Sequence, residues 1–173
     1  MGMTALVTGG AGFIGSHLAQ RLLADGAEVI VLDNLSTGSL KNLETFRSNP
    51  KLQFVKGDIR DSTLVQLLTS RSEAVFHLAA AVGVQLIADA PVHTIETNIA
   101  GTEVVLEAAN KFGRRILLAS SSEVYGKSEN VPFHGTMTSC SAAQLSPAGP
   151  TRAARPSTSS WARRSTNSTA CTS

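Results

Sequence analysis

Short apolar runs alternate with stretches of helical periodicity along the first 120 residues of the chain. The apolar runs, each typical of a buried strand, are residues 5–7, 28–34, 52–59, 74–80 and 115–120. The longest helical pattern follows Pro91 and carries apolar residues such as Ile95 and Ile99. Regular alternation of strand and helix predicts an α/β fold: a doubly wound parallel sheet with right-handed crossovers, in the strand order 3-2-1-4-5.

A glycine-rich turn at residues 9–15 joins the first apolar run to the first helical pattern. Gly10, Gly12 and Gly15 have the spacing G-x-G-x-x-G, in the strand–turn–helix context in which such glycines bind a dinucleotide. One glycine makes the tight turn, another lets the backbone approach a pyrophosphate, and Gly15 lets the helix lie close to the strand. The N–H groups at the start of the helix then point at the phosphates. The motif predicts a Rossmann-like unit, and a tight turn without a ligand is the alternative.

The second apolar run ends in Asp33, close to the distance of about 20 residues from the glycine motif at which a ribose-binding acid is expected. A carboxylate there accepts both ribose hydroxyls of adenosine and repels a 2′-phosphate. No arginine follows within residues 34–38. These two observations favour NAD over NADP as the cofactor, and the alternative is an aspartate that merely ends a strand.

The composition of the chain changes abruptly near His134. All acidic residues lie at or before Glu129, and residues 135–173 contain no Asp, Glu, Lys, Val, Ile or Phe. Such a segment cannot bury enough apolar surface to offset its ordering entropy. We therefore expect two parts: an incomplete dinucleotide-binding domain over residues 1–134, and an irregular, disordered Ser/Thr/Ala/Arg-rich tail over residues 135–173.

Bulk properties point to a cytoplasmic protein. The formal net charge is +2, and no apolar stretch is long enough to cross a membrane. The first strand begins almost at Met1, which leaves no room for a signal peptide. Cys140 and Cys171 have neither metal-ligand spacing nor a disulfide context, so no metal is expected. The four arginines of the tail are too few to indicate a nucleic-acid partner. We expect neither nucleic acid nor a membrane as a partner.

Six motifs in order give the first 134 residues a family resemblance. They are residues 8–17, 32–35, 57–60, 77–80, 98–102 and 120–126. With them the chain resembles the extended short-chain dehydrogenase/reductase family, specifically its nucleotide-sugar epimerases, dehydratases and decarboxylases. The resemblance implies NAD as cofactor and a UDP- or dTDP-linked sugar as substrate. It also implies a homodimer formed through a four-helix bundle that includes the helix around residues 98–109.

The resemblance assigns roles to individual residues. Phe13 and Ile14 would cover the pyrophosphate, and residues 78–80 would line the nicotinamide side. The full set of implied cofactor contacts is Gly9, Gly12, Phe13, Ile14, Gly15, Asp33, Asn34, Asp58, Ile59, Leu78, Ala79, Ala80 and Asn98.

The implied catalytic residues follow the fifth apolar run. Ser121 would hydrogen-bond the 4-oxygen of the sugar, and Ser122 and Glu123 stand where dehydratases carry an acid and base pair. Decarboxylases that resemble this chain carry Ser and Glu at those two positions. Backbone capping is the alternative interpretation of the serine run. We interpret His77, at the end of an apolar strand, as a packed, hydrogen-bonded histidine and not as a base.

The catalytic motif of the family, Tyr-x-x-x-Lys, is missing from this sequence. In it a lysine lowers the pKa of the phenol, so that tyrosinate takes the 4-hydroxyl proton of the sugar. Tyr125 is the only tyrosine, it lies inside the strand-end motif, and no lysine stands four positions after it. Codons formed from the last base of one visible codon and the first two of the next permit tyrosine and lysine four apart within residues 147–161. We therefore favour a shifted or mis-assigned reading frame for the tail over a genuine disordered one.

The functional hypothesis is an NAD-dependent nucleotide-sugar epimerase that works through a 4-keto intermediate, present here as an N-terminal fragment that is inactive as written. A UDP-glucuronate decarboxylase or a dTDP-sugar 4,6-dehydratase of the same family is the alternative, because Ser122 and Glu123 leave that choice open. A non-catalytic NAD-binding module is the alternative from another class.

Overall fold

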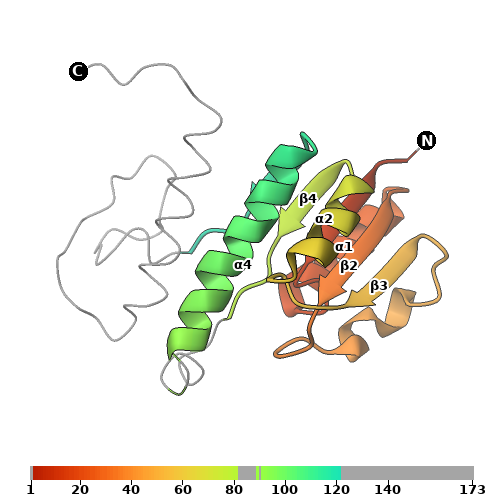
Figure 1. The fold of residues 1–173 in the computed structure, drawn as a ribbon. Helices are drawn as coiled ribbons and strands as arrows, with labels where there is room; N and C mark the ends of the chain where they lie inside the picture. Colours follow the sequence, from red (N-terminus) through yellow and green to blue (C-terminus); the bar gives the residue numbers. More distant parts are fainter. Residues whose placement is uncertain (1, 82–88, 90, 122–173) are drawn as a thin grey trace, which may run out of the picture.

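A five-stranded parallel sheet forms the centre of the protein (Figure 1). The computed structural model describes residues 2–81, 89 and 91–121; Ser122, Glu123, Tyr125 and the tail at 135–173 lie outside the described residues. The strands are β1 (Thr4–Thr8), β2 (Glu28–Asp33), β3 (Leu52–Lys56), β4 (Ala74–His77) and β5 (Arg115–Leu118). Their order is β3-β2-β1-β4-β5, with parallel pairing throughout, which confirms the predicted order.

Helices cover both faces of the sheet. The α1 helix (Phe13–Ala24) and a 3-10 helix, η1 (Leu40–Phe46), pack on one face, and α2 (Ser62–Ser70) and α4 (Pro91–Lys111) pack on the other. Figure 1 shows α2 and α4 together on one side of the strands. The sequence pattern gave no indication of η1, which begins after Ser39, whose side chain accepts a hydrogen bond from the N–H of Lys41 at 3.3 Å.

The central strand β1 contributes to two separate cores because successive side chains of a strand point to opposite faces. Leu6 belongs to the cluster beneath α2 and α4, and Val7 belongs to the cluster beneath α1 and η1. Both side chains are fully buried. A strand buried on both faces reads as a continuous apolar run, which is why this element was visible in the sequence.

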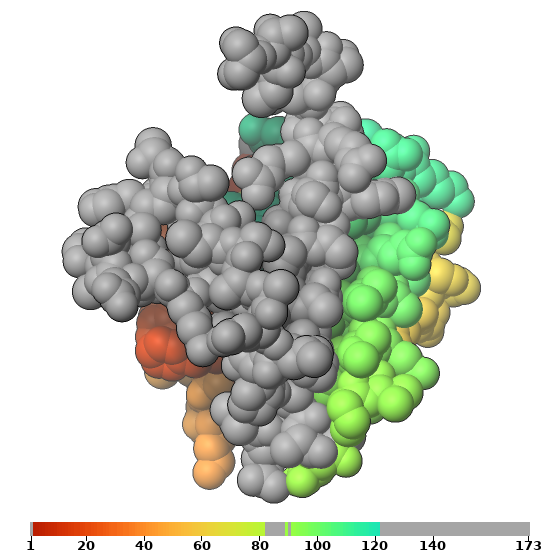
Figure 2. Space-filling model, turned by 90° about the vertical axis from the view of Figure 1, so that its left-hand side faces the viewer, coloured from red at the N-terminus to blue at the C-terminus, as the bar shows by residue number. Residues whose placement is uncertain are grey.

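The first half of α4 buries a polar face, which differs from the expected apolar one. Ile95 and Ile99, which we expected at apolar positions, are 40% and 39% exposed. The residues that face the protein in this half are Thr94, Thr97, Asn98, Gly101 and Thr102. At Gly101 the helix comes so close that a Cβ atom would lie 2.5 Å from Cδ1 of Ile59. The exposed side of α4, in green, lies on the right-hand part of the face shown in Figure 2.

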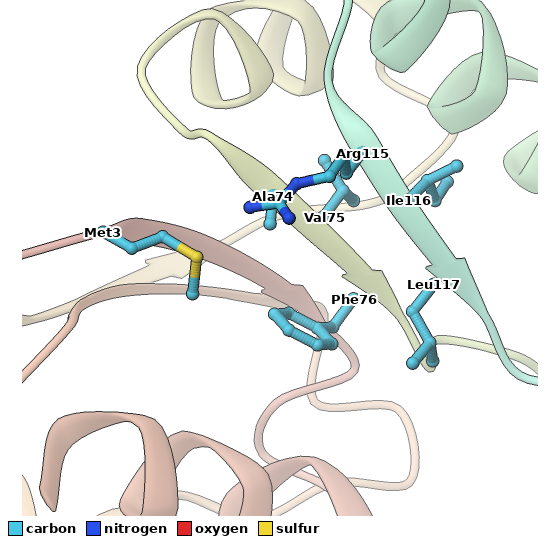
Figure 3. A pocket seen from close by; sticks show the side chains of 7 residues that line it. All are labelled: Met3, Ala74, Val75, Phe76, Arg115, Ile116 and Leu117. Carbon is cyan, nitrogen blue, oxygen red and sulfur yellow. The ribbon is translucent and has the colours of Figure 1, made fainter. Parts of the chain in front are cut away.

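An apolar hollow of about 260 Å³ lies beside β4 and β5 (Figure 3). Its lining residues are Met3, Ala74, Val75, Phe76, Arg115, Ile116 and Leu117. Phe76 and Leu117 are cross-strand partners, and Leu117 is 53% exposed. Ala74 and Arg115 are the first residues of their strands, so the hollow lies toward the amino ends. Ligands of doubly wound sheets bind at the carboxyl ends, and we therefore do not place the cofactor in this hollow.

Candidate cofactor-binding site

The carboxyl edge of the sheet brings together most of the residues predicted to form the site. The glycine turn follows β1, Asp33 ends β2, residues 78–80 follow β4, and Ser121 lies three residues beyond β5. Because β1 pairs with β2 on one side and β4 on the other, the direction of winding changes at its carboxyl end. This is the switch point at which doubly wound sheets bind dinucleotides.

The glycine turn is held tightly against its neighbours. The N–H of Gly9 donates to the carbonyl oxygen of Leu32 at 2.8 Å, and the N–H of Gly12 donates to that of Gly9 at 3.1 Å. Gly9 has φ +71°, and a Cβ there would lie 2.7 Å from the backbone nitrogen of Ala79. A Cβ on Gly15 would collide with the carbonyl group of Gly9. Both positions therefore require glycine for steric reasons.

The amino end of α1 is open for an anionic ligand. Gly12 is the N-cap and offers no side chain to the helix. The N–H groups of residues 13–15 lie in the first turn, where an α-helix supplies no intrahelical partner. Phe13 and Ile14 are 78% and 69% exposed beside them. This helix start fits a bound pyrophosphate, because its N-cap residue has no side chain, its first turn has N–H donors, and two apolar side chains are exposed beside it.

Asp33 is fixed by the backbone at the carboxyl end of β2. Its Oδ2 accepts the N–H of Ala11 at 2.9 Å, and its Oδ1 accepts the N–H of Leu35 at 2.8 Å. The residue is only 8% exposed, so these bonds set its orientation. A carboxylate offers about four lone-pair sites, and two backbone bonds leave capacity for the two hydroxyls of a ribose.

Asp58, after β3, forms a charged cluster with Arg60 and Asn34. Nε and Nη2 of Arg60 donate to the two carboxylate oxygens of Asp58 at 2.9 and 2.8 Å. The hydrogen bond from Arg60 is the largest cause that lowers the pKa of Asp58, from 3.8 to about 2, and the side chain of Asn34 contributes in the same direction. Ile59, next in the chain, is buried under α4. The structure thus brings Asn34 and Asp58, two of the implied cofactor contacts, together.

The segment that follows β4 is held by side chains of β1 and α4. The N–H of Leu78 donates to the carbonyl oxygen of Thr8 at 3.1 Å, and the N–H of Ala79 donates to Oγ1 of Thr8 at 3.3 Å. Asn98 pairs with the backbone of Ala81 twice, accepting its N–H at 2.8 Å and donating to its carbonyl oxygen at 3.0 Å. The amide of Asn98 is thus engaged with the protein, and its direct contact with a cofactor stays a prediction.

His77 is buried and hydrogen-bonded, as the sequence predicted. Its Nδ1 lies 2.7 Å from Oγ1 of Thr8 and its Nε2 lies 3.0 Å from Oγ1 of Thr102. Sequence reasoning missed both threonines. The available signal was weak: Thr8 ends an apolar strand, and Thr102 occurs in the motif at residues 98–102.

Ser121 is half-buried at the same edge of the sheet. It follows β5, the neighbour of β4, so it lies on the β4 side of the switch point and not on the side of Asp33. Ser122 and Glu123 lie outside the described residues, and their acid and base roles stay predictions. Within the described ranges, no group of three or more His, Cys, Asp or Glu side chains is placed to hold a metal ion. Nor does any helix among those residues have the length and apolar character to cross a membrane.

The fold and this edge define an α/β protein of the Rossmann type. A family model described as GDP-mannose 4,6 dehydratase matches residues 6–172. The chain belongs to this family, among the NAD-dependent nucleotide-sugar epimerases and dehydratases of the extended short-chain dehydrogenase/reductases.

Individual relatives carry several different activities. A UDP-glucose 4-epimerase of Mycolicibacterium smegmatis is 46% identical over 127 residues, which are 72% of this chain and 41% of that protein. UDP-glucuronic acid decarboxylase 2 of Arabidopsis thaliana is 42% identical over 125 residues, or 72% of this chain and 27% of that protein. A dTDP-glucose 4,6-dehydratase of Streptomyces venezuelae, solved with NAD bound, superposes with a TM-score of 0.81 at 36% identity. That match covers 94% of this chain and 51% of the dehydratase, so this chain spans about half of that length.

Proposed function

We propose that this chain binds NAD across the carboxyl end of β1. The adenosine ribose lies on Asp33, the pyrophosphate lies on the first turn of α1, and the nicotinamide half lies over the segment that follows β4. The observation that carries this proposal is the Asp33 carboxylate, oriented by Ala11 and Leu35 beside the bare helix start. NAD is present in solved structures of related enzymes, among them the dehydratase of Streptomyces venezuelae and a UDP-glucose 4-epimerase of Thermus thermophilus.

Calorimetric titration of the purified chain with NAD, NADP and ADP-ribose tests this proposal. We expect binding of NAD and ADP-ribose, and weaker binding of NADP, because its 2′-phosphate would meet the carboxylate of Asp33. Absence of binding by all three nucleotides, or equal affinity for NAD and NADP, would refute it.

For the intact protein we propose an NAD-dependent 4-epimerase of a nucleotide sugar. NAD held by Asp33 and the first turn of α1 would supply reversible hydride transfer at C4 of the sugar. Ser121 follows β5, on the proposed nicotinamide side, and would hydrogen-bond the 4-oxygen of the sugar. The proton of that 4-hydroxyl group would pass to a base. The identity of 46% to an epimerase supports this choice.

A decarboxylase of a UDP-uronic acid is a second candidate, and one observation favours it. UDP-glucuronic acid decarboxylases 1 and 2 of Arabidopsis thaliana are both 42% identical to this chain. Ser122 and Glu123 have the residue types that the family resemblance assigns to decarboxylases. Release of carbon dioxide from UDP-glucuronate by the intact protein would favour the decarboxylase, and interconversion of 4-epimers without release of carbon dioxide would favour the epimerase.

The sequence of the tail decides between an enzyme and a non-catalytic NAD-binding module. We propose that the reading frame shifts near residue 134, which removes the family's Tyr-x-x-x-Lys motif. Resequencing the coding DNA around codon 134 tests this directly. A single-base change that restores tyrosine and lysine four apart supports the enzyme, whereas an intact frame that related genes share supports the module.

We further propose that the intact protein forms a homodimer through the outer face of α4. Val92, Ile95 and Ile99 are 66%, 40% and 39% exposed on this helix. Their spacing of three and four residues places them in one stripe on the helix surface. Unpartnered apolar stripes of this kind are typical of surfaces that pack against another helix.

A further inference from the structure

A chain of hydrogen bonds centred on His77 connects β1, β4 and α4 beneath the segment at residues 78–81. Nδ1 of His77 pairs with Thr8 at 2.7 Å and Nε2 pairs with Thr102 at 3.0 Å. Thr102 in turn donates to the carbonyl oxygen of Asn98 at 2.7 Å. His77, Thr8, Thr102 and Asn98 are all buried, so water does not compete for these bonds.

The hydrogen bonds around His77 favour one of its two nitrogens as the site of the proton. A threonine hydroxyl has a single hydrogen, and that of Thr102 is used toward the carbonyl oxygen of Asn98. Oγ1 of Thr102 must therefore accept from His77, so the hydrogen is on Nε2. On the other side, Oγ1 of Thr8 accepts the N–H of Ala79 and donates its own hydrogen to Nδ1. Neutral histidine in the Nε2–H form is the state that satisfies each of these hydrogen bonds.

This directionality links the imidazole to the backbone after β4. Because the hydroxyl of Thr8 donates its hydrogen to His77, a lone pair of Oγ1 is left to accept the N–H of Ala79. This hydrogen bond of 3.3 Å holds Ala79. Thr102 fixes the carbonyl group of Asn98 and with it this turn of α4. The side-chain amide of Asn98 in turn holds Ala81, at the other end of the segment at residues 78–81. The same segment presses on Gly9, where a Cβ would lie 2.8 Å from Cα of Ala79.

We propose that His77, in its neutral Nε2–H form, is a positioning residue that acts through Thr8 and Thr102 to hold residues 78–81 in the shape required for the nicotinamide half of the dinucleotide. This inference rests on the proposed NAD binding, in which the sheet order places adenosine on the β2 side and nicotinamide on the β4 side. None of the three side chains touches the cofactor in this proposal. Their role is to fix backbone that does.

The test compares the affinities of NAD and ADP-ribose, which lacks the nicotinamide, for the full 173-residue chain and its variants. Thr8→Val and Thr102→Val keep the side-chain shape and remove one hydroxyl each. Thr69→Val is the matched control, because Oγ1 of Thr69 is buried without a hydrogen-bond partner among the described residues. Thr102→Ser restores the hydroxyl and serves as the conservative variant.

We expect Thr8→Val and Thr102→Val to weaken NAD binding about five- to tenfold, the effect of one lost hydrogen bond, with less than about a twofold change for ADP-ribose. Thr69→Val and Thr102→Ser should match the unmutated chain with both ligands. Equal losses for both ligands, or no loss for either, would overturn the positioning role. Binding of neither ligand by the unmutated chain would instead overturn the proposed function, and this inference with it.

A second measurement does not depend on the variants or on a ligand. Nitrogen-15 NMR of the imidazole in the unmutated chain should show a protonated Nε2 and an unprotonated Nδ1 for His77. Protonation at Nδ1, alone or together with Nε2, at neutral pH would contradict the proposed hydrogen-bond directions.

Discussion

The backbone N–H of Ala11 donates to Oδ2 of Asp33 across 2.9 Å, and this bond ties the glycine turn to the end of β2. The two residues are 22 positions apart in the chain. A ligand that contacted the turn through its phosphates would therefore also lie beside the carboxylate that we propose binds its ribose. This relationship makes Asp33 the position at which cofactor preference is most directly tested.

Asp33→Ser should reduce the preference for NAD over NADP. The substitution removes the negative charge that repels a 2′-phosphate together with two hydrogen bonds to the ribose hydroxyls. We expect NAD affinity to fall about tenfold or more, because hydrogen bonds to a charged group contribute about 1.5–3 kcal/mol each. Asp33→Ala should act in the same direction. Calorimetric titration provides the measurement, and Asp25→Ser, at the far end of α1, is the control that should leave both affinities unchanged.

Gly15→Ala should destabilise the protein more than Gly101→Ala. Both glycines lie within helices, where alanine is favoured by about 1 kcal/mol. At Gly15 the new Cβ would lie 2.7 Å from Cα of Gly10, a backbone atom that cannot move aside. At Gly101 it meets Cδ1 and Cγ1 of Ile59, which are side-chain atoms and can shift more readily than backbone. Urea unfolding should show a loss of about 1–3 kcal/mol for Gly15→Ala, as for overpacked cores, and a smaller loss for Gly101→Ala. A reversed order would contradict the assigned contacts.

Carbon-13 NMR titration should give a pKa of about 2 for the carboxyl group of Asp58. A pKa lowered in the folded state means that the pair stabilises the fold above the ordinary pKa of 3.8, and that this contribution is lost as the pH falls from 3.8 through about 2. Arg60→Ala should raise the pKa of Asp58 toward 3.8, because the bond from Arg60 is the largest cause of the shift. An unchanged titration in that variant would show that Arg60 does not hold the carboxylate.

Ile99→Lys should prevent the proposed dimer of the intact protein. A charge in the middle of the exposed stripe of α4 would have to be desolvated in a helix–helix contact, which is costly without a partner. Multi-angle light scattering of a chain with the tail frame restored should give a dimer for the unmutated protein and a monomer for the variant. Glu44→Lys, an exposed site in η1 on the other face of the sheet, is the charge control. A dimer that persists in Ile99→Lys would place the interface elsewhere.

The 173-residue chain should show no turnover of nucleotide sugars, whereas a frame-restored full-length protein should be active. The chain lacks a tyrosine and lysine four apart, and loss of a general base alone costs about 10²–10⁴-fold in rate. Loss of the groups that position the sugar against the nicotinamide adds a further factor that exceeds roughly 10⁵. An assay of NAD-dependent conversion over a panel of UDP- and dTDP-sugars compares the two proteins. Comparable turnover by both would show that the tail is not an out-of-frame product.

The central strand and the position of Asp33 were predictable because each depends on a local signal. A fully buried run such as β1, and an acid such as Asp33 at a strand end, are visible in one sequence. The buried polar face of α4 was not predictable, since Thr102 and Asn98 are buried by bonds to residues more than 15 positions away. The expectation that Ile95 and Ile99 are buried was wrong for the same reason. Helical periodicity identifies an apolar stripe but does not show which part of the protein covers it.

The central strand of the sheet is also the first to be synthesised, and this order has a consequence for folding in the cell. Thr4 and its β2 partner Glu28 are 24 residues apart in the chain, whereas Ala5 is followed by its β4 partner Ala74 only about 70 residues later. At synthesis rates of about 5–20 residues per second, that delay amounts to roughly 4–14 s. For this time one edge of β1, with an apolar side chain on each face, has no strand beside it, and unpaired strand edges promote association between chains. Until β4 leaves the ribosome, this unpaired edge therefore exposes the nascent chain to association with other chains.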